Sequence, residues 1–325
     1  MKGKQESKII ELVCTNPWYN LAFNEYLLRE TGEEEISLLL WQNKKSVVVG
    51  RNQNLRRVCR LQQVEAEGGK LARRLSGGGA VYQDQGCLNF AFLGDKQRFK
   101  LEHQLRVVLR AVQSLGLKAG FSGNRDLEAG GENFLFNTFY HREQVSLHHG
   151  TIMVDSELAN RERYLKSTED EAVKERYVNL SQLEPDLVIE DLKDKLRESF
   201  VEIYGEPGTA KRLDPRKQEK LKPLYDRYSS REWYLRVLPE FDVSYQTRFD
   251  WGRVELGLIL DGDRIEMAVI YSDAVEADLI EKMAAVIEGA PFSLEAVIKR
   301  LDLLIGGGPD KKIVNDLKIW LKSKI

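Results

Sequence analysis

A glycine-rich segment at residues 73–82 carries the strongest chemical signal in this 325-residue chain. Its order is Arg-Arg-Leu-Ser-Gly-Gly-Gly-Ala-Val-Tyr, so two arginines stand just before three consecutive glycines. Glycines let main-chain N–H groups approach a ligand closely, and arginine donates paired hydrogen bonds to a phosphate or carboxylate. The segment therefore predicts an anion-binding loop. It differs from a P-loop and from a dinucleotide fingerprint, and the alternative is a flexible hairpin with two solvated arginines.

The histidines offer weaker evidence for a reactive site. All four lie between residues 103 and 149, and His148 and His149 are adjacent. Adjacent side chains of a strand point to opposite faces of the sheet, so the pair is not expected to chelate one metal ion. We predict no metal site, and either one histidine faces a ligand or both are structural.

The cysteines are odd in number and contain no CxxC pair: Cys14, Cys59 and Cys87. This pattern argues against a disulfide framework or a structural zinc site and fits a reducing cytoplasm. Cys87 follows Gly86 close to the glycine-rich segment and is a candidate thiol nucleophile. The alternative for Cys87 is a small buried hydrophobic residue.

The overall composition excludes several classes of protein. Lysine and arginine total 49 against 51 aspartates and glutamates, which gives a net charge of -2 and no global positive field for nucleic acid. No apolar run approaches the roughly 18 residues of a membrane span, and the first ten residues show no secretory signal pattern. We therefore expect a soluble, cytoplasmic protein that binds neither nucleic acid nor membrane.

The elements that must position these residues can be read from apolar spacing. Helices are predicted over residues 16–30, 61–67, 104–115, 156–165 and 189–204. Strands are predicted over residues 37–41 and 46–50, paired as a hairpin, and over residues 70–74, 79–83, 88–93, 134–136, 138–140 and 149–154. Antiparallel strands surrounded by helices favour an α+β fold, with mixed or antiparallel sheets flanked by helices.

The length and composition predict two domains. Residues 205–233 are rich in lysine, arginine, proline and glycine, which is the composition of a partly helical linker. We therefore predict a domain over residues 1–238, with a charged linker from about residue 205, and a small α+β domain over residues 239–325. The latter contains a predicted hairpin, residues 249–260 and 264–271 around the turn 261–263, and predicted helices at 274–287 and 293–304.

Four segments together resemble the lipoate-protein ligase A family, relatives of biotin ligases and of lipoyl and octanoyl transferases. They are residues 16–22, 49–54, 73–82 and 148–151, in the family's order and spacing. This resemblance covers about the first 180 residues. Residues 248–252 and the hairpin after them resemble the family's small C-terminal accessory domain. The expected fold is thus a biotin/lipoate ligase-like catalytic domain with an accessory domain.

The resemblance implies a two-step reaction. Lipoate or octanoate reacts with ATP, which is bound with Mg²⁺, to give an acyl-adenylate and pyrophosphate. The acyl group then passes to a lysine on a lipoyl domain of a 2-oxoacid dehydrogenase subunit or on the glycine-cleavage H protein. The implied adenylate and substrate contacts fall on Arg51, Arg74, Gly77, Gly78, Gly79, Ala80, Val81, Tyr82 and His149, and the implied pocket-lining positions also include Trp18, Val48 and Gly50.

The chain departs from the family at the reacting centre. Counting from the motifs on either side places Asn133 where the family has a lysine that contacts the acyl carbonyl and the phosphate. Leu135, Phe136 and Thr138 replace small residues of the same motif, and residues 167–176 are shorter and more acidic than the family's adenylate-covering loop. An asparagine brings no charge, and the loss of one charge-assisted contact costs roughly a hundred- to thousand-fold in rate.

Three hypotheses follow. The chain is predicted to be an ATP-dependent ligase in which Arg125, Arg142 or a lysine of the linker supplies the missing charge. The second hypothesis is an ATP-independent acyl transferase that uses a preformed acyl group, with Cys87 taking the acyl group. The third is a binding protein for a lipoyl domain or a free acyl ligand, in which Leu135 and Phe136 fill the former active site.

Overall fold

The computed structural model describes residues 6–96, 99–123, 126–142, 144–166, 177–236, 240–305 and 309–325. Its contacts divide the chain into two units. The first unit comprises Met1–Val48, Arg56–Arg73 and Ala80–Tyr234, and the second comprises Val49–Leu55, Arg74–Gly79 and Leu235–Ile325. The second unit therefore takes in residues 74–79 of the glycine-rich segment, which the sequence placed in the catalytic domain. The boundary predicted after residue 238 falls among residues 237–239, which lie outside the described residues.

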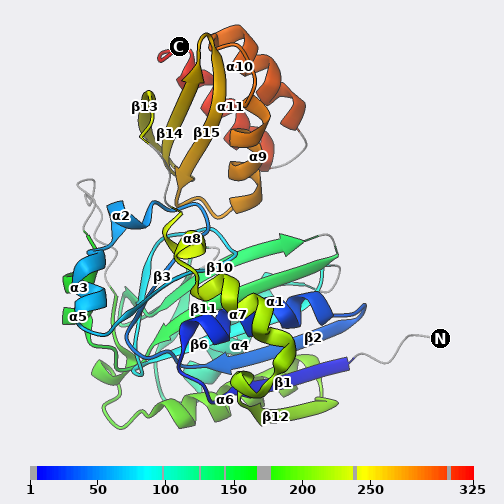
Figure 1. Ribbon diagram of the computed structural model, residues 1–325. Coiled ribbons are helices and arrows are strands. Elements are labelled where there is room, and N and C mark those ends of the chain that lie inside the picture. The colour runs from blue at the N-terminus through cyan, green and yellow to red at the C-terminus, as the bar shows by residue number, and fades with distance from the viewer. Residues whose placement is uncertain are drawn as a thin grey trace. The chain divides into compact units, whose positions relative to one another are not determined.

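A six-stranded mixed sheet forms the centre of the first unit (Figure 1). Its order is β10-β11-β6-β2-β1-β12. Strand β1, next to the edge strand β12, pairs in parallel with β2 and β12, and the remaining pairs are antiparallel. The bounds are β1 (Glu6–Leu12), β2 (Glu35–Trp41), β6 (Cys87–Asp95), β10 (Leu135–Arg142), β11 (Val145–Met153) and β12 (Thr209–Leu213).

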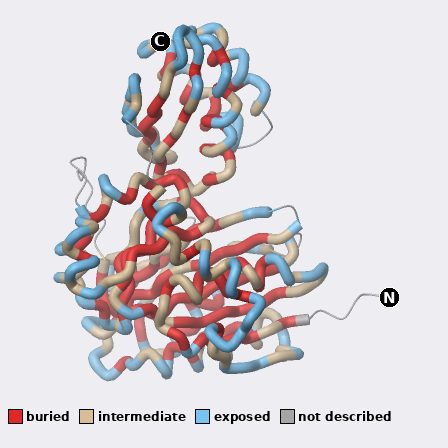
Figure 2. The backbone as a smooth tube through the Cα atoms, in the orientation of Figure 1, coloured by how far each residue is buried: buried red, intermediate tan, exposed pale blue. Residues whose placement is uncertain are grey.

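Helices cover both faces of this sheet, which confirms the predicted α+β class. On β2, Ile36, Leu38 and Leu40 pack into one core with α4 (Leu101–Gln113) and α6 (Ile189–Tyr204). The alternate residues Leu39 and Trp41 pack into another core with α1 (Pro17–Glu30). The inner strands β1, β2, β6 and β11 are consequently buried along most of their length (Figure 2).

The helix predicted over residues 16–30 is confirmed as α1. Asn16 caps it, because its side-chain oxygen accepts a hydrogen bond of 3.0 Å from the Trp18 backbone N–H. Pro17 occupies the first helical position, where its missing N–H costs nothing. The helix predicted over residues 189–204 is likewise confirmed as α6, and the helix predicted at 104–115 begins earlier, as α4.

The hairpin predicted for residues 37–50 is wrong. Strand β3 (Ser46–Val49) lies in a second sheet of order β4-β3-β5, with β4 (Lys70–Arg73) and β5 (Val81–Gln83). Both edges of β2 are already paired, with β1 and β6, so the turn after β2 carries the chain to another sheet. Asn43 holds this turn, since it accepts from Asn20 Nδ2 at 2.8 Å and donates to Gln83 Oε1 at 2.6 Å.

The linker predicted over residues 205–233 is also wrong. Strand β12 completes the main sheet beside β1, and α7 (Lys222–Ser229) and α8 (Arg231–Leu235) follow it. Tyr228 of α7 donates a hydrogen bond of 2.8 Å to the buried carboxylate of Glu25 on α1, and Arg227 pairs with the same carboxylate. The charged composition of this region reflects solvent-facing side chains on folded elements.

Smaller elements complete the first unit. A sheet of order β7-β8-β9 consists of β7 (Ala119–Ser122), β8 (Asp126–Ala129) and β9 (Glu132–Asn133). The two strands predicted at 134–140 form the single strand β10. Short helices are α2 (Leu55–Val58), α3 (Leu61–Ala66), α5 (Leu158–Tyr164), η1 (Leu180–Gln182), η2 (Pro215–Lys217) and η3 (Glu219–Leu221).

The C-terminal part of the second unit is an antiparallel sheet packed against helices. Its order is β13-β14-β15, with β13 (Val243–Phe249), β14 (Gly252–Asp261) and β15 (Arg264–Ser272). The predicted β14–β15 hairpin is confirmed, with Gly262 at φ 61° in its turn. The helices are α9 (Ala277–Ile287), α10 (Leu294–Leu301), η4 (Asp302–Leu304) and α11 (Pro309–Leu321).

None of the helices in the described ranges is long and apolar enough to cross a bilayer.

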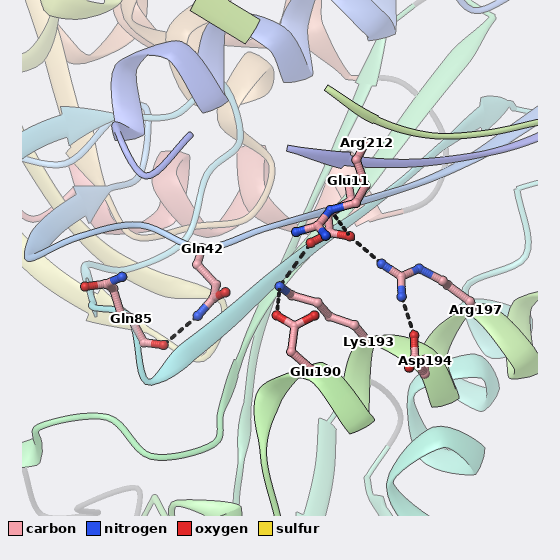
Figure 3. Close-up of polar contacts among 8 residues, drawn as sticks. All are labelled: Glu11, Gln42, Gln85, Glu190, Lys193, Asp194, Arg197 and Arg212. Carbon is pink, nitrogen blue, oxygen red and sulfur yellow. Dashed lines mark hydrogen bonds and ion pairs between the residues drawn. The ribbon is translucent and has the colours of Figure 1, made fainter. Parts of the chain in front are cut away.

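A buried ionic network joins β1 to α6 and β12 (Figure 3). The side chain of Glu11 is only 4% exposed, and its carboxylate lies 3.1 Å from Lys193 Nζ and 3.2 Å from Arg212 Nε. Arg197 also pairs with Glu11, and Lys193 contacts Glu190 at 2.7 Å. Each buried charge therefore has an opposite partner, as burial requires.

Replacing Glu11 by alanine is expected to lower the free energy of unfolding by about 3 kcal/mol, because Lys193 stays buried without its buried partner. Urea denaturation would measure this change. Glu190→Ala is the matched control, since that side chain is 65% exposed and its removal should cost about 1 kcal/mol or less. Equal losses in the two variants would contradict this account of the network.

Candidate functional site

The glycine-rich loop at residues 74–79 is held by the backbone of the second unit. The Arg51 N–H donates to Ser76 O at 2.9 Å, and the Gly78 N–H donates to Ala274 O at 3.0 Å. The loop is thus pinned to the segment 49–55 on one side and to the residues after β15 on the other. This pinning rules out the flexible hairpin that was the alternative interpretation.

The structure explains the three glycines of the loop in different ways. A Cβ on Gly77 would lie 2.1 Å from Ala274 O, and Gly78 has φ +86°. The neighbouring Gly50 also needs to be glycine, because a Cβ there would lie 2.0 Å from Gly78 O. Around Gly79, by contrast, no described atom lies within 4 Å of an added Cβ. Packing therefore explains Gly77 and backbone conformation explains Gly78, whereas Gly79 leaves space beside the backbone.

Arg74 organises the loop from inside. Its side chain is buried and donates to Ser76 Oγ at 3.2 Å and to the carbonyl oxygens of Gly77 and Gly79, each at 2.7 Å. Burial lowers the pKa of its guanidinium to about 9. In this conformation Arg74 fixes the loop carbonyls, and its contact with a phosphate stays a prediction.

Arg73 acts on a different part of the chain. It is fully buried, and its Nε and Nη2 donate to the carbonyl oxygens of Trp233 and Tyr234 at 3.1 and 2.9 Å. The Trp233 indole N–H donates back to Arg73 O at 2.9 Å. Arg73 therefore binds carbonyl groups of α8, whereas the sequence placed its charge beside the glycines.

Arg51 is held by carboxylates of α9. Its Nε and Nη2 contact the two oxygens of Glu281 at 2.9 and 2.6 Å, and its Nη1 contacts Asp278 at 2.6 Å. Such a two-pronged pair fixes the guanidinium plane. The predicted role of Arg51 at the ligand pocket is not shown by these contacts and stays a prediction.

Alanine substitutions should separate the two kinds of glycine. Gly77→Ala is expected to lower stability by about 2 kcal/mol, because backbone must move to admit the methyl group. Gly79→Ala should change stability by about 0.5 kcal/mol or less. Thermal and urea unfolding of both variants would test this, and a large loss in Gly79→Ala would contradict the open space beside that residue.

One face of the main sheet presents polar side chains near the end of β5. On β11, His149 and Thr151 lie opposite Thr138 and Phe136 of β10. On the other side, Thr151 lies opposite Asn89 of β6. Because side chains alternate along a strand, these residues share one face. We call this set of five residues the site face.

His148 points to the opposite face, as the alternation predicted. It is fully buried, its Nδ1 lies 2.9 Å from Gln104 Oε1, and its ring stacks on Phe139 at 4.7 Å and on Phe92 at 5.8 Å. Burial lowers the pKa of His148 to about 3. This histidine is structural, and only His149 shares the site face.

The buried His148 should make stability depend on pH. Its folded pKa lies below the unfolded value, so its contribution is complete above about pH 6.5 and is lost as the pH falls. Between pH 6 and 4, the free energy of unfolding should drop about 1.4 kcal/mol per pH unit more steeply than in His148→Leu. Urea denaturation across this range measures both slopes. Parallel curves would show that His148 is not the group responsible.

A chain of buried amides connects β5 to the site face. Gln83 Nε2 donates to Thr151 Oγ1 at 2.7 Å, and Thr151 Oγ1 donates to Asn89 Oδ1 at 2.8 Å. Since Gln83 also accepts from Asn43, the network reaches the turn after β2. Sequence reasoning missed it, although amide residues inside otherwise apolar strands were the available signal.

The remaining predicted residues of the loop lie on or beside β5. Val81 pairs with Val48, and Tyr82 is buried, with its hydroxyl accepting from Asn160 Nδ2 at 3.4 Å. Burial raises the pKa of Tyr82. Ala80, just before the strand, is half-buried. The contacts of these residues with a ligand stay predictions.

Trp18 is positioned by α1 and β4. Its indole N–H donates to Leu71 O at 2.9 Å, and Lys70 Nζ lies 4.4 Å from the ring centroid. The ring is half-buried. Its predicted place in the ligand pocket is not tested by these contacts.

Cys87 is poorly suited to act as a nucleophile. The residue is 1% exposed, and burial raises the pKa of its thiol to about 12. At neutral pH the reactive thiolate is therefore almost absent. Cys59 has a pKa of about 12 for the same reason. These properties favour the buried-hydrophobe interpretation of Cys87.

Asn133 ends β9, and its backbone is tied to the chain beyond residue 176. Its carbonyl oxygen accepts from the Val178 N–H at 2.9 Å. Two residues on, Leu135 is buried in the main core, and the ring of Phe136 stacks on Tyr177 at 4.0 Å. The segment thus carries a neutral amide and two large apolar side chains.

A further residue joins this aromatic pair. The guanidinium of Arg161, on α5, lies 5.1 Å from the Tyr177 ring centroid and 6.0 Å from that of Phe136. Sequence reasoning missed both Arg161 and Tyr177. No local motif marks them, because their proximity to Phe136 arises only in the folded chain.

Two of the cations proposed to replace the lysine lie far from Asn133. Arg142 is exposed at the far end of β10, nine residues from Asn133, which is about 30 Å of extended strand. Lys211 of the supposed linker lies in β12, at the opposite edge of the sheet from β10. Arg125 and residues 167–176 lie outside the described residues.

Within the described ranges, no group of three or more histidine, cysteine or acidic side chains is arranged to hold a metal ion.

Comparisons with known proteins agree over nearly the whole chain. The family described as lipoyl protein ligase A/B catalytic domain matches residues 16–201, and the bacterial lipoate protein ligase C-terminus matches residues 238–309. A curated protein of Psychrobacter cryohalolentis named lipoate-protein ligase A is 31% identical over 330 residues, covering 97% of each chain.

Solved structures show the same fold. The crystal structure of P. falciparum LipL1 in complex with lipoate matches with a TM-score of 0.87 and 24% identity, covering 97% of this chain and 99% of that one. An ATP-bound lipoate-protein ligase A matches with a TM-score of 0.64 and 24% identity, covering 72% of this chain and all of that one. With both domains matched and a relative aligned along its full length, the chain belongs to the lipoate-protein ligase family, as its motifs predicted.

Proposed function

We propose that this protein is an ATP-dependent lipoate-protein ligase. It activates lipoate or octanoate with ATP, which enters with Mg²⁺ as the substrate complex, and transfers the acyl group to a protein lysine. The full-length match to a curated lipoate-protein ligase A carries the proposal. The rigid glycine loop, with open space beside Gly79, supports it, because a phosphate can approach the backbone there.

The first step joins the acid to the nucleotide. A carboxylate oxygen of lipoate attacks the α-phosphorus of ATP, a new P–O bond forms, and the bond to the β-phosphate breaks as pyrophosphate leaves. Backbone N–H groups around Gly79 and Ala80 would donate to the phosphate oxygens, where charge develops. Val48 and Val81, paired in the small sheet, would line the acyl chain.

The second step transfers the acyl group. The amine of the acceptor lysine attacks the acyl carbonyl, AMP leaves with its electron pair, and the proton of the amine passes to solvent. A structure of a bipartite lipoate protein ligase of Thermoplasma acidophilum is described together with its E2 lipoyl domain. This supports a lipoyl domain as the acceptor, and the H protein of glycine cleavage is the second acceptor that we propose.

A binding protein without catalysis is the second candidate. The neutral Asn133, the buried Leu135 and the stacked Phe136 favour it, because they replace a charged and small-residue motif. The transferase that uses Cys87 is less well supported, since its thiol is buried and protonated at neutral pH.

Incubation with lipoate, Mg-ATP and an apo lipoyl domain should release pyrophosphate and add one lipoyl group to the acceptor. Pyrophosphate is read with a coupled assay and the acceptor by intact mass. Omitting ATP should abolish both signals, and an acceptor whose lysine is replaced by arginine should remain unmodified.

A silent wild-type protein, tested with lipoate and with octanoate, would refute the ligase proposal. Binding of the acyl ligand or acceptor without turnover would then support the binding protein. Activity that appears only in Asn133→Lys would identify the missing charge as the cause. Modification without ATP would instead support the transferase.

A further inference from the structure

Positive charge stabilises a bound nucleotide phosphate. The arginines in and near the glycine-rich loop, however, form most of their hydrogen bonds with groups of the protein itself. Arg73 donates to carbonyl groups of α8, Arg74 donates to the loop carbonyls, and Arg51 is paired with Asp278 and Glu281. Asn133 is neutral. The structure therefore raises the question of which cation faces the phosphate beyond the loop.

We propose that Arg161 binds the phosphate of the acyl-adenylate and supplies the positive charge that Asn133 cannot. The inference rests on the proposed function and adds a residue to the same site. Arg161 lies on α5, and its guanidinium lies over the ring of Tyr177, 5.1 Å from the ring centroid, and 6.0 Å from the ring centroid of Phe136.

Two sets of contacts place α5 beside the part of the predicted adenylate site that lies in the first unit. Next to Arg161, Asn160 donates to the hydroxyl of Tyr82 at 3.4 Å, and the rings of Tyr82 and Tyr164 lie 5.6 Å apart. These contacts join α5 to β5, which follows the glycine loop. The stack of Arg161 on Tyr177 joins the same helix to the Asn133 segment, because Tyr177 forms a bridge with Asn133. The helix thus connects the two predicted halves of the site in the first unit.

The guanidinium of Arg161 is available for an anion. Among the described residues, no carboxylate forms an ion pair with it, whereas the nearby Arg163 pairs with Glu67. A cation–π contact holds a guanidinium over an aromatic face without using its N–H donors. An arginine held in this way can still donate paired hydrogen bonds to a phosphate.

This arrangement also accounts for the bulk of Phe136. A small residue at this position could not form the stack, so Phe136 and Tyr177 act together as a platform for the cation. The charge would reach the phosphate from α5, whereas the family lysine would reach it from the segment at residue 133. The covalent steps are unchanged: as the α-phosphorus exchanges pyrophosphate for the carboxylate, Arg161 stabilises negative charge on the phosphate oxygens.

The test is Arg161→Gln, which removes the charge and keeps much of the length. We expect kcat for pyrophosphate release to fall by about 100-fold, with an unchanged melting temperature. Arg163→Gln is the matched control on the same helix and should stay within about twofold of wild type. Asn133→Lys should raise kcat at least about tenfold more in the Arg161→Gln background than in the wild-type background, because the two charges replace each other, whereas a purely structural role of Arg161 would give equal gains.

Two results would overturn the proposal. One is an active wild type whose Arg161→Gln variant keeps its kcat within about threefold. The other concerns binding: lipoyl-AMP, titrated by calorimetry, should bind at least about tenfold more weakly to Arg161→Gln, and equal affinity would refute the contact. Because this titration does not need turnover, a wild type that is silent in the assay refutes the ligase function while the role of Arg161 is still decided.

Discussion

The burial of both faces of the six-stranded sheet is the constraint on which the rest of the structure depends. Helices α4 and α6 cover one face and α1 covers the other, so the residues of the inner strands must suit one of two packed layers. Buried polar side chains pair with one another inside these layers, as Gln83 donates to Thr151 and Thr151 donates to Asn89. The same alternation buries His148 in the core and leaves His149 on the site face.

The need to pair buried polar groups also decides where the arginine side chains lie. Arg73 and Arg74 are adjacent in the sequence and look equivalent, but both are buried and each satisfies a different set of backbone carbonyls. A buried guanidinium must donate its hydrogen bonds to the protein groups that surround it. An arginine that binds a ligand must instead be held by contacts that do not use its N–H donors. The contact of Arg161 with the ring of Tyr177 is of this kind.

Local patterns and non-local pairing differed in how well they could be predicted. Helix α1 was predictable because Asn16 and Pro17 give a start signal, and the β14–β15 hairpin was predictable because its turn is local. The hairpin at residues 37–50 and the linker at 205–233 failed for a common reason. The partners of β2 and β12 are strands distant in sequence, and β-pairing has no local signature that identifies them.

The sequence by itself determined the family, the α+β class and the absence of a lysine at position 133, because motifs and residue identities are properties of the linear chain. Tertiary structure alone decided which groups those residues meet. In the folded chain, Arg74 donates hydrogen bonds to its own loop, and the Cys87 thiol is buried. Arg161 contacts the rings of Phe136 and Tyr177, which are 25 and 16 residues away in the sequence. Burial and stacking depend on contacts between distant segments, and these exist only once the chain has folded.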